Sequence, residues 1–372
     1  MNQDLLIRLI SFSALTLFVS GAIFADEETA TTLVDDTATL DVTYVDSDSS
    51  ARSVVIREEV TQQLVVPNIA TRTVVPSEEK DAVLLPSVDT ISGAEIRTFQ
   101  RYDIASVLRQ SAGVSVTTLG GEGAQTSFFV RGFESDHTVV LLNGRRLPRG
   151  LGGQYQVEFL DVSNLESFQF SRGPASSLYG SDALAGAIDL RTADARFVET
   201  NTLSTYVEGG SFNTFRSGGK ATLRDGRVGI TLDGSFLQTR NDRVVRSDYE
   251  NHTFRANVAY EIGDGIYLDV LGSVQDAFLQ TPGQRSFGGF PNFAFPTNQT
   301  NANQSGLFSP RISIIREDWD FTTFYSYTEN TLTDRNNPGF GFWNIDSRLE
   351  QQGEDWESQF IYLPNEDVTL TV

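Results

Sequence analysis

Apolar and polar residues alternate at every second position over long stretches in the second half of the chain. The stretches 228–236, 254–261 and 266–274 all follow this pattern, and in the second of them Arg255 and Asn257 stand between apolar neighbours. A β-strand turns successive side chains to opposite faces, so each stretch predicts a strand with one apolar and one polar face. A transmembrane barrel has this pattern, with lipid outside and water inside, and a soluble β-sandwich has it too.

The connections between these stretches distinguish the two architectures. Asp225-Gly226, Gly263-Asp264-Gly265 and Asn365-Glu366-Asp367 predict tight turns, whereas 280–306 and 330–347 are long, rich in Asn and Gly, and contain aromatic residues. Outer-membrane barrels combine short turns at one end with long loops at the other. The alternation of lengths therefore favours a barrel, with the loop from Gln280 as a candidate ligand-facing loop.

The stretch from Thr126 to Thr192 follows another pattern, in which short apolar runs end at glycines. Asn143-Gly144 follows four apolar residues and predicts a tight hairpin turn, because both turn positions favour positive φ. Gly132, Gly173 and Gly180 each predict a further sharp turn. These residues alone predict a compact domain of short strands, without indicating a chemistry.

Two short helices are predicted before that domain. Ser92 and Glu95 have the spacing of a capping box, and Asp103 is placed to cap a second helix that ends at Gly113. The apolar residues of both helices fall on one face, so we expect them to contribute to the core.

The N-terminal segment has the features of a secretory signal. Arg8 precedes an apolar run from Leu9 to Phe24, and cleavage is expected after Ala25. The alternative is a single membrane anchor, although the run is shorter than the ~20 residues that a spanning helix needs. Residues 26–61 are rich in Asp, Glu, Ser and Thr and contain one aromatic residue, Tyr44, so they are expected to form a disordered leader.

Composition excludes several classes of function. The formal net charge of −21 argues against a nucleic-acid partner, and the absence of Cys excludes disulfides and thiol nucleophiles. His137 and His252 have no partners in the sequence for a catalytic or zinc site. Asp242 and Asp248 could contribute to a calcium site, but the dense Asp spacing of a calcium loop is missing. We therefore predict no enzyme activity, no cofactor and no metal site.

The middle of the chain closely resembles the plug of TonB-dependent outer-membrane receptors. The resemblance extends from about Leu64 to Thr192 and rests on an ordered set of motifs: Gly-Glu-Gly at 121–123, Phe-Val-Arg-Gly at 129–132, Leu-Leu-Asn-Gly-Arg at 141–145 and Leu-Tyr-Gly-Ser-Asp-Ala at 178–183. The order most resembles the cobalamin receptor branch, closely followed by the receptors for catecholate siderophores.

The resemblance implies an α+β plug domain followed by an incomplete transmembrane antiparallel β-barrel. The family barrel has about 22 strands, more than the 180 residues from 193 to 372 can supply, so we expect an N-terminal fragment. The expected division is a signal peptide, a leader, a TonB box region, a plug and the first part of the barrel, at residues 1–25, 26–61, 62–72, 73–192 and 193–372.

The resemblance also implies three groups of functional residues. The first is the TonB box, an extended segment that would add as a strand to a TonB sheet; the expected box is Leu64, Val65, Val66, Pro67 and Asn68. Two rival boxes begin at Thr31 and Thr39, and an ordinary first plug strand is the other alternative.

The second group is a ligand-binding apex of the plug, and the third joins the plug to the barrel wall. The expected apex residues are Gly121, Glu122, Gly123, Gln125, Arg149, Gln154 and Tyr155. The expected plug and barrel contacts are Arg131, Arg145, Arg146 and Arg172, which could pair with wall carboxylates. Solvated turns and surface arginines are the alternatives.

The function implied is energy-coupled uptake of a scarce nutrient, cobalamin or a ferric siderophore, across the outer membrane. The implied partners are TonB with its inner-membrane energising complex, a small metal-chelate or corrinoid ligand, and outer-membrane lipid. A secreted or surface β-rich adhesin without transport activity would also explain the signal, the acidity and the alternation. A hydrolase is a further alternative, but the sequence contains no site for it.

Overall fold

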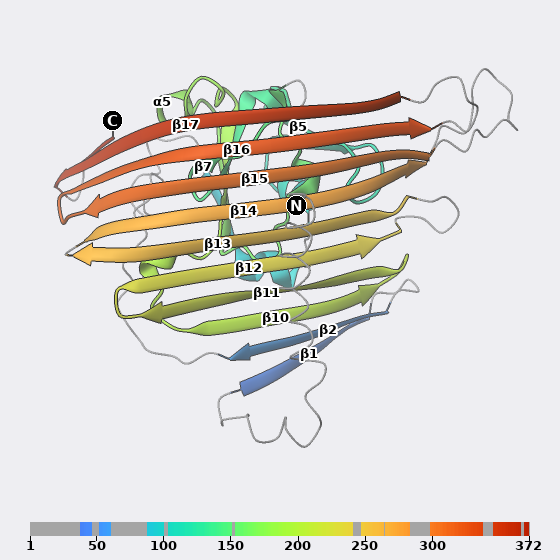
Figure 1. Cartoon of the computed structure of the whole chain (residues 1–372), viewed down its shortest axis with the longest axis horizontal. Helices are drawn as coiled ribbons and strands as arrows, with labels where there is room; N and C mark the ends of the chain where they lie inside the picture. The colour runs from blue at the N-terminus through green and yellow to red at the C-terminus, as the bar shows by residue number, and fades with distance from the viewer. Residues whose placement is uncertain are drawn as a thin grey trace, which may run out of the picture.

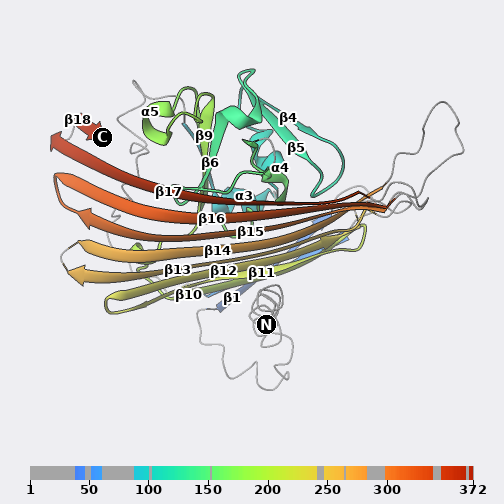
Figure 2. The same ribbon diagram turned by 45° about the horizontal axis from the view of Figure 1, so that its top comes forward.

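The protein consists of a curved antiparallel sheet and a small α+β domain on its concave side (Figures 1 and 2). The computed structural model describes residues 38–46, 52–60, 88–99, 103–150, 153–240, 247–263, 265–282, 298–337, 345–365 and 368–371. The expected signal peptide and the expected TonB box at 64–68 lie outside these residues. Within the described part of the chain, no helix has the length and apolar character needed to cross a membrane.

The sheet contains eleven described strands, and each long strand is hydrogen-bonded to the next along the chain. The bounds are β10 Thr202–Gly210, β11 Thr214–Asp225, β12 Val228–Thr239, β13 Tyr249–Gly263, β14 Ile266–Pro282, β15 Asn298–Ile315, β16 Trp319–Asn337, β17 Ile345–Asn365 and β18 Val368–Thr371. All three stretches with period-two alternation form strands, as predicted. Every second residue of β13 from Tyr249 to Ala259 is buried on the concave side.

The strands extend further than the sequence suggests. The segments 280–306 and 330–347 are expected to be long loops, but β14 continues to Pro282, β15 begins at Asn298, and β16 and β17 leave only residues 338–344 between them. Unbroken pairing explains the difference, because the register runs without a shift from Ile266 opposite Ile314 to Pro282 opposite Asn298. The polar composition of these segments favours loops, but the backbone N–H and C=O groups of their paired parts are hydrogen-bonded between neighbouring strands.

Two strands lie within the segment for which a disordered leader is expected. Strands β1, Ala38–Asp46, and β2, Arg52–Val60, pair with each other, and β2 also pairs with β10. The expectation of disorder is therefore wrong for these residues. Pairing with β2 satisfies the backbone groups along the edge of β10, which gives a reason for ordering a segment with a polar composition. The rival TonB box that begins at Thr39 falls in β1.

The plug contains a five-stranded sheet in the order β3-β8-β9-β6-β7 and a separate hairpin of β4 and β5. Its strands are β3 Val88–Ser92, β4 Val114–Thr118, β5 Thr126–Val130, β6 Thr138–Leu142, β7 Arg145–Arg146, β8 Ser167–Arg172 and β9 Gly186–Arg191. Its helices are α3 Gly93–Thr98, α4 Ile104–Leu108 and α5 Ser176–Tyr179, with 3₁₀ turns η1 Ser135–His137, η3 Val157–Phe159 and η4 Ala195–Phe197.

Local sequence signals are confirmed in the plug. The capping box of Ser92 and Glu95 is present, and the Asp103 carboxylate accepts a hydrogen bond from the Ser106 backbone N–H at 2.7 Å. Asn143 and Gly144 have φ of 50° and 79° in the β6–β7 turn. The second helix is shorter than predicted, since it ends at Leu108 and two further turns precede Gly113.

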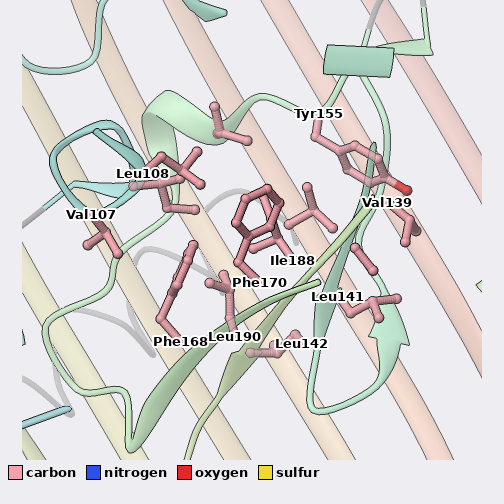
Figure 3. Close-up of a cluster of buried hydrophobic side chains, with 14 of the residues drawn as sticks. Val107, Leu108, Val139, Leu141, Leu142, Tyr155, Phe168, Phe170, Ile188 and Leu190 are labelled. Atoms are coloured by element: carbon pink, nitrogen blue, oxygen red, sulfur yellow. The ribbon is translucent and has the colours of Figure 1, made fainter. Parts of the chain in front are cut away.

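The apolar core of the plug lies between its sheet and its helices. Phe168 and Phe170 of β8, Ile188 of β9 and Leu108 of α4 are fully buried and in one cluster (Figure 3). Burying each such side chain stabilises the fold by about 1.5–3 kcal/mol. The cluster also includes Leu307 of β15, so the core of the plug continues onto the wall.

Candidate functional site

The contact zone between the plug and the wall is the candidate functional site, and a fully buried ion pair lies within it. Arg145, in the hairpin of β6 and β7, donates from Nη2 to Asp269 Oδ2 of β14 at 2.8 Å and from Nε to Ser309 Oγ at 3.1 Å. The side chains of Arg145 and Asp269 are 1% and 0% exposed. Burial lowers the pKa of Arg145 to about 10, so its guanidinium remains charged at neutral pH.

Asp269 also binds a second arginine of the wall. Arg311 of β15 donates from Nε to Asp269 Oδ1 at 2.6 Å, and the amide of Asn257 donates to Asp269 Oδ2 at 3.2 Å. Both carboxylate oxygens are therefore used. Charged hydrogen bonds in a dry environment are stronger than neutral ones, and an arginine left there without its partner would be costly.

The segment that leaves the plug joins the same network. Asp194 accepts from Arg196 Nη2 at 2.7 Å and lies 3.5 Å from Arg311 Nη2. Burial acts to raise the pKa of Asp194, but Arg196 and Arg311 outweigh it and hold that pKa well below its usual range. Asp194 and Asp269 thus connect the exit segment, the β6–β7 turn and the wall through shared arginines.

The backbone of the exit segment is in close contact with the wall. Thr231 donates to the Ala193 carbonyl at 3.1 Å, and the Ala195 N–H donates to Asn257 Oδ1 at 3.1 Å. A Cβ at Gly229 would lie 1.8 Å from the Ala195 carbonyl oxygen. Only glycine permits this approach, so the exit segment is fixed to β12 and β13 by shape as well as by hydrogen bonds.

A second area of contact lies near the end of the sheet where β12 and β14 terminate. Wall side chains donate to plug carbonyl oxygens there: Asn251 to Phe159 at 2.7 Å, and Arg255 to Asp161 at 3.0 Å. Gln275 also donates to the Phe159 carbonyl. The wall therefore recognises main-chain groups of Phe159 and Asp161.

Gly123 packs flat on a tyrosine of the wall. It has φ of 76°, and a Cβ at this position would lie 2.2 Å from the ring of Tyr249. The same ring stacks with Phe159, with 6.4 Å between ring centroids. The loop between β4 and β5, on the side of the plug nearest that end of the sheet, is thereby held against β13 (Figure 2).

Two glutamates of the plug lie beside Tyr249 in a small polar cavity. Burial raises the pKa of Glu158 to about 7, against hydrogen bonds from its own backbone and from Thr126. Burial also raises the pKa of Glu122, and Arg216 of the wall partly opposes this shift. The cavity has a volume of about 20 Å³, and Asp103 and Asp161 also line it. This contact is therefore sensitive to proton concentration near neutral pH.

The expected apex residues fall at different depths. Gly121 and Gln125 are exposed, and Glu122 and Gln154 are half-buried. Tyr155 is 4% exposed, which corrects the expectation of an accessible stacking ring at the apex. Its ring belongs to the buried plug cluster, and Arg149 lies over it with the guanidinium carbon 5.2 Å from the ring centroid.

Of the four arginines expected to contact the wall, the structure places two there. Arg145 binds Asp269 as described, and Arg146 lies 3.3 Å from Glu357 of β17 and from Asp182 of the plug. Arg172 corrects the expectation, because it binds Asp89 at 2.7 Å and the Ala112 carbonyl within the plug.

Arg131 lies at the surface of the plug. Its side chain is exposed, and its backbone N–H donates to the Gly113 carbonyl of the plug at 2.9 Å. A glycine turn next to an arginine does not determine the direction in which the arginine side chain points.

The convex face of the sheet is apolar. Tyr260, Leu268 and Ile312 are neighbours across β13, β14 and β15, and they are 46%, 41% and 45% exposed. Trp356 of β17 is 74% exposed. An apolar exterior opposite a polar interior is the arrangement of a barrel wall in lipid, in which aromatic residues are also common.

Sequence reasoning missed the wall side of the interface. The alternation of apolar and polar residues places Arg255 and Asn257 on the polar face of a strand, and it gives Asp269 the same position in the stretch 266–274. A charged residue in the middle of such a strand is the sequence feature that could have indicated a contact with the plug. Its partner could not be read from the sequence, since Asp161 and Arg255 are separated by 94 positions.

Comparison with known proteins agrees with this architecture. The family model described as TonB-dependent Receptor Plug Domain matches residues 83–187. The vitamin B12 transporter BtuB of Vibrio cholerae serotype O1 is 29% identical over 185 residues, which cover 49% of this chain and 30% of that protein. This chain thus spans less than a third of the length of that curated relative.

Solved structures show the same fold at low sequence identity. The siderophore receptor PiuA from Acinetobacter baumannii is similar with a TM-score of 0.55 and 15% identity, covering 74% of this chain and 42% of that chain. FpvA of P. aeruginosa, solved with heterologous pyoverdines, has a TM-score of 0.59 and 12% identity, covering 78% and 41%.

The matched plug, the polar interface and the apolar outer face lead to one identification. The chain contains a TonB-dependent receptor plug domain followed by barrel strands, and TonB-dependent receptors are outer-membrane proteins.

Proposed function

We propose that this chain forms the plug and the first wall strands of a receptor that imports a scarce nutrient across the outer membrane with energy delivered through TonB. The observation that carries the proposal is the interface of Arg145 with Asp269. Its polar contacts join a folded plug to a wall with a lipid-compatible outer face, alongside the apolar contact at Leu307.

We propose cobalamin as the first ligand to test and a ferric siderophore as the second. The curated relative named as a vitamin B12 transporter shares 29% identity over half of this chain, whereas the siderophore receptors share its fold at 12–15% identity. On this proposal Gly121, Glu122, Gln125, Arg149 and Gln154 contact the ligand from the plug. Tyr155 supports Arg149 from below.

TonB is proposed to capture Leu64, Val65, Val66, Pro67 and Asn68 as an added strand. Main-chain hydrogen bonds would provide the affinity in this mode of binding. The segment precedes β3, which is the edge strand of the plug sheet and pairs with β8. A force applied before Val88 would therefore act first on one edge of the plug. The boundaries of the leader, the box region and the plug at 61, 72 and 192 are part of this proposal.

A substitution pair in the full-length receptor tests the coupling. Val65→Pro removes a backbone donor and restricts φ, whereas Val65→Ala keeps both the donor and the φ range. We expect Val65→Pro to abolish uptake of radiolabelled cyanocobalamin by cells while surface binding stays unchanged, and Val65→Ala to retain uptake. Equal uptake by both variants would contradict the assignment of the box.

Growth experiments identify the ligand, and cell fractionation tests the location of the protein. A deletion strain of the source bacterium should fail to grow on limiting cobalamin and should grow normally on limiting iron. The opposite result would select the ferric siderophore. Recovery of the protein as a freely secreted product, without heat-modifiable mobility in the outer-membrane fraction, would favour the adhesin and end the proposal.

A further inference from the structure

A hairpin from the leader, rather than β10, forms one edge of the described sheet (Figure 1). Strand β2 pairs with β10 over seven positions, from Val60 opposite Leu203 to Val54 opposite Gly209, and β1 pairs with β2 along its whole length. Strands β1, β2 and β10 have nine residues each. A transmembrane β-strand needs about 9–11 residues, so the hairpin is long enough to span a bilayer beside β10.

The register places the apolar residues of the hairpin on the convex face of the sheet. Residues directly opposite each other in an antiparallel pair lie on the same face. Leu203 and Val207 of β10 are 48% and 40% exposed and share the face of Tyr260 through the registers of β11, β12 and β13. Seven of the eight hairpin residues on that face are aliphatic or aromatic; the eight are Ala38, Leu40, Val42, Tyr44, Val54, Ile56, Glu58 and Val60.

The concave face of the hairpin is mostly polar, as in the rest of the wall. Asp41 of β1 stands directly opposite Arg57 of β2, and opposite charges at such cross-strand positions stabilise a sheet. Six of the eight residues on this face are polar or charged; the eight are Thr39, Asp41, Thr43, Val45, Ser53, Val55, Arg57 and Glu59. The hairpin therefore continues both faces of the wall in register.

The one aromatic residue of the leader falls in a row with an exposed aromatic residue of the wall. Tyr44 stands opposite Val54, Val54 opposite Gly209, and Gly209 opposite Phe215 of β11, which is 40% exposed. This row lies at the end of the sheet from which the long connections 240–248 and 283–297 extend. Aromatic residues gather at the two membrane boundaries of a barrel, so Tyr44 occupies the position of a boundary residue.

We propose that residues 38–60 form two membrane-spanning strands of the wall, with Asp46 and Arg52 at the outer surface of the cell. Ala38 and Val60 are then at the periplasmic end, together with the tight turn Asp225-Gly226. A hairpin adds two strands, so it keeps the strand number of a bacterial barrel even and returns the chain to the periplasm.

The one charged residue on the apolar face is compatible with this placement. Glu58 lies two positions before the periplasmic end of β2 at Val60. A charged side chain on the lipid face of a barrel is costly at the middle of the bilayer and is tolerated near its boundaries, and carboxylates cost less than arginine or lysine.

A further consequence of the hairpin rests on the function proposed above. Leu64, the first residue of the proposed TonB box, follows Val60 by four positions, which span at most about 14 Å. The hairpin would therefore tether the box to the periplasmic rim of the wall on one side, while the chain continues to β3 of the plug on the other. The placement of the hairpin itself does not depend on TonB.

Cysteine labelling of intact cells tests the placement, because the chain contains no Cys. Asp46→Cys in the full-length receptor is treated with a membrane-impermeant maleimide, and Arg52→Cys is the second position if the first variant fails to fold. Gln238→Cys, at the end of β12 with the long connections, is the positive control, and Asp225→Cys, at the tight-turn end, is the negative control.

We expect Asp46→Cys to be labelled several-fold more strongly than Asp225→Cys in intact cells, and about as strongly as Gln238→Cys. The unsubstituted receptor gives the background. Labelling of both hairpin positions only after the outer membrane is permeabilised would place the leader in the periplasm and overturn the proposal.

Disulfide cross-linking tests the pairing with β10. Directly opposite residues of an antiparallel pair have Cα atoms about 4.5–5.5 Å apart, within reach of a disulfide. Ile56→Cys combined with Val207→Cys joins opposite residues, whereas Ile56→Cys combined with Thr205→Cys is the matched control, because Thr205 lies on the same face opposite Glu58. We expect several-fold more cross-linked receptor for the first pair in the outer-membrane fraction.

Heat-modifiable mobility verifies folding of these variants, and Glu58→Cys combined with Thr205→Cys is the second in-register pair if the first does not fold. Equal cross-linking of the in-register and control pairs, or none in either, would overturn the pairing. Labelling and cross-linking need no transport, so failure of the TonB box or of the ligand assignment would leave both results unchanged.

Discussion

Arg145 and Asp269 are 124 positions apart in the sequence and 2.8 Å apart in the structure, and neither side chain is measurably open to solvent. One residue belongs to a turn of the plug and the other to the inner face of the wall. Their contact therefore holds two separately patterned parts of the chain in one arrangement.

Removing the carboxylate should loosen the plug. In Asp269→Ala, Arg145 and Arg311 lose their shared partner while still buried, and we expect a loss of about 3–5 kcal/mol in the stability of the docked plug. Calorimetric melting of the full-length receptor, with hydrogen exchange of residues 138–146, measures it. The control is Glu166→Ala, which breaks the exposed contact with Lys220 and should cost about 1 kcal/mol or less. Equal losses would show that burial does not set the strength of the pair.

Gly123 should be far less tolerant of substitution than another glycine in the same backbone conformation. Gly123→Ala adds a methyl group into the ring of Tyr249, whereas Gly132, with φ of 89°, has open space at its Cβ position. Both alanines carry a backbone cost of about 1–2 kcal/mol. We expect only Gly123→Ala to raise hydrogen exchange across residues 119–125. Similar exchange in the two variants would argue that the loop does not rest on Tyr249.

Glu158 should make the stability of the plug depend on pH. Its pKa is raised to about 7 in the folded protein, so the folded state binds the proton more tightly than the unfolded chain. Stability is then greatest below about pH 4.3, the ordinary value for glutamate, falls as the pH rises to about 7, and is flat above it. Glu158→Gln should remove up to about 3 kcal/mol of this decline and should melt higher than the wild type at pH 8.

Melting at pH 5 and pH 8 measures that effect. Glu166→Gln, at a carboxylate that is 49% exposed, should keep the wild-type difference between the two pH values. A Glu158→Gln variant that keeps the full difference would assign the pH dependence to other groups.

The convex face should tolerate a new charged residue only outside the region of its exposed apolar side chains. Val258 is 45% exposed between Ala256 and Tyr260 on β13, and Val258→Arg should cost about 2–4 kcal/mol for insertion near the middle of the bilayer. Gln238, exposed at the end of β12, is the control, since Gln238→Arg should insert normally. The yield of heat-modifiable protein in lipid vesicles measures both. Equal yields would argue against lipid contact at this face.

The sequence predicts the elements better than their partners. Asn143-Gly144, the capping box of Ser92 and the alternation in β12 to β14 depend on neighbouring residues, and all are confirmed. The direction of Arg172 depends on Asp89, which is 83 positions away and reaches it only after the plug sheet has formed. Local patterns determine strands and turns, whereas interface partners follow from the assembled fold.

Tyr155 illustrates the same limit. A tyrosine in a glycine-rich loop suggested an accessible ring, yet the loop folds back so that Arg149 covers it. The depth of a side chain is a property of the packed domain, which composition of the loop cannot specify.

The wall binds Phe159 and Asp161 by their carbonyl oxygens, and this affects how the receptor can evolve. Asn251, Gln275 and Arg255 donate to oxygens that every amino acid carries. Replacing the side chain of Phe159 or Asp161 would leave these backbone bonds available, while removing the stacking of Phe159 on Tyr249 or the ion pair of Asp161 with Arg255. Changes in the three wall residues would each remove a hydrogen bond to the plug backbone, so a randomised library should accept few of them.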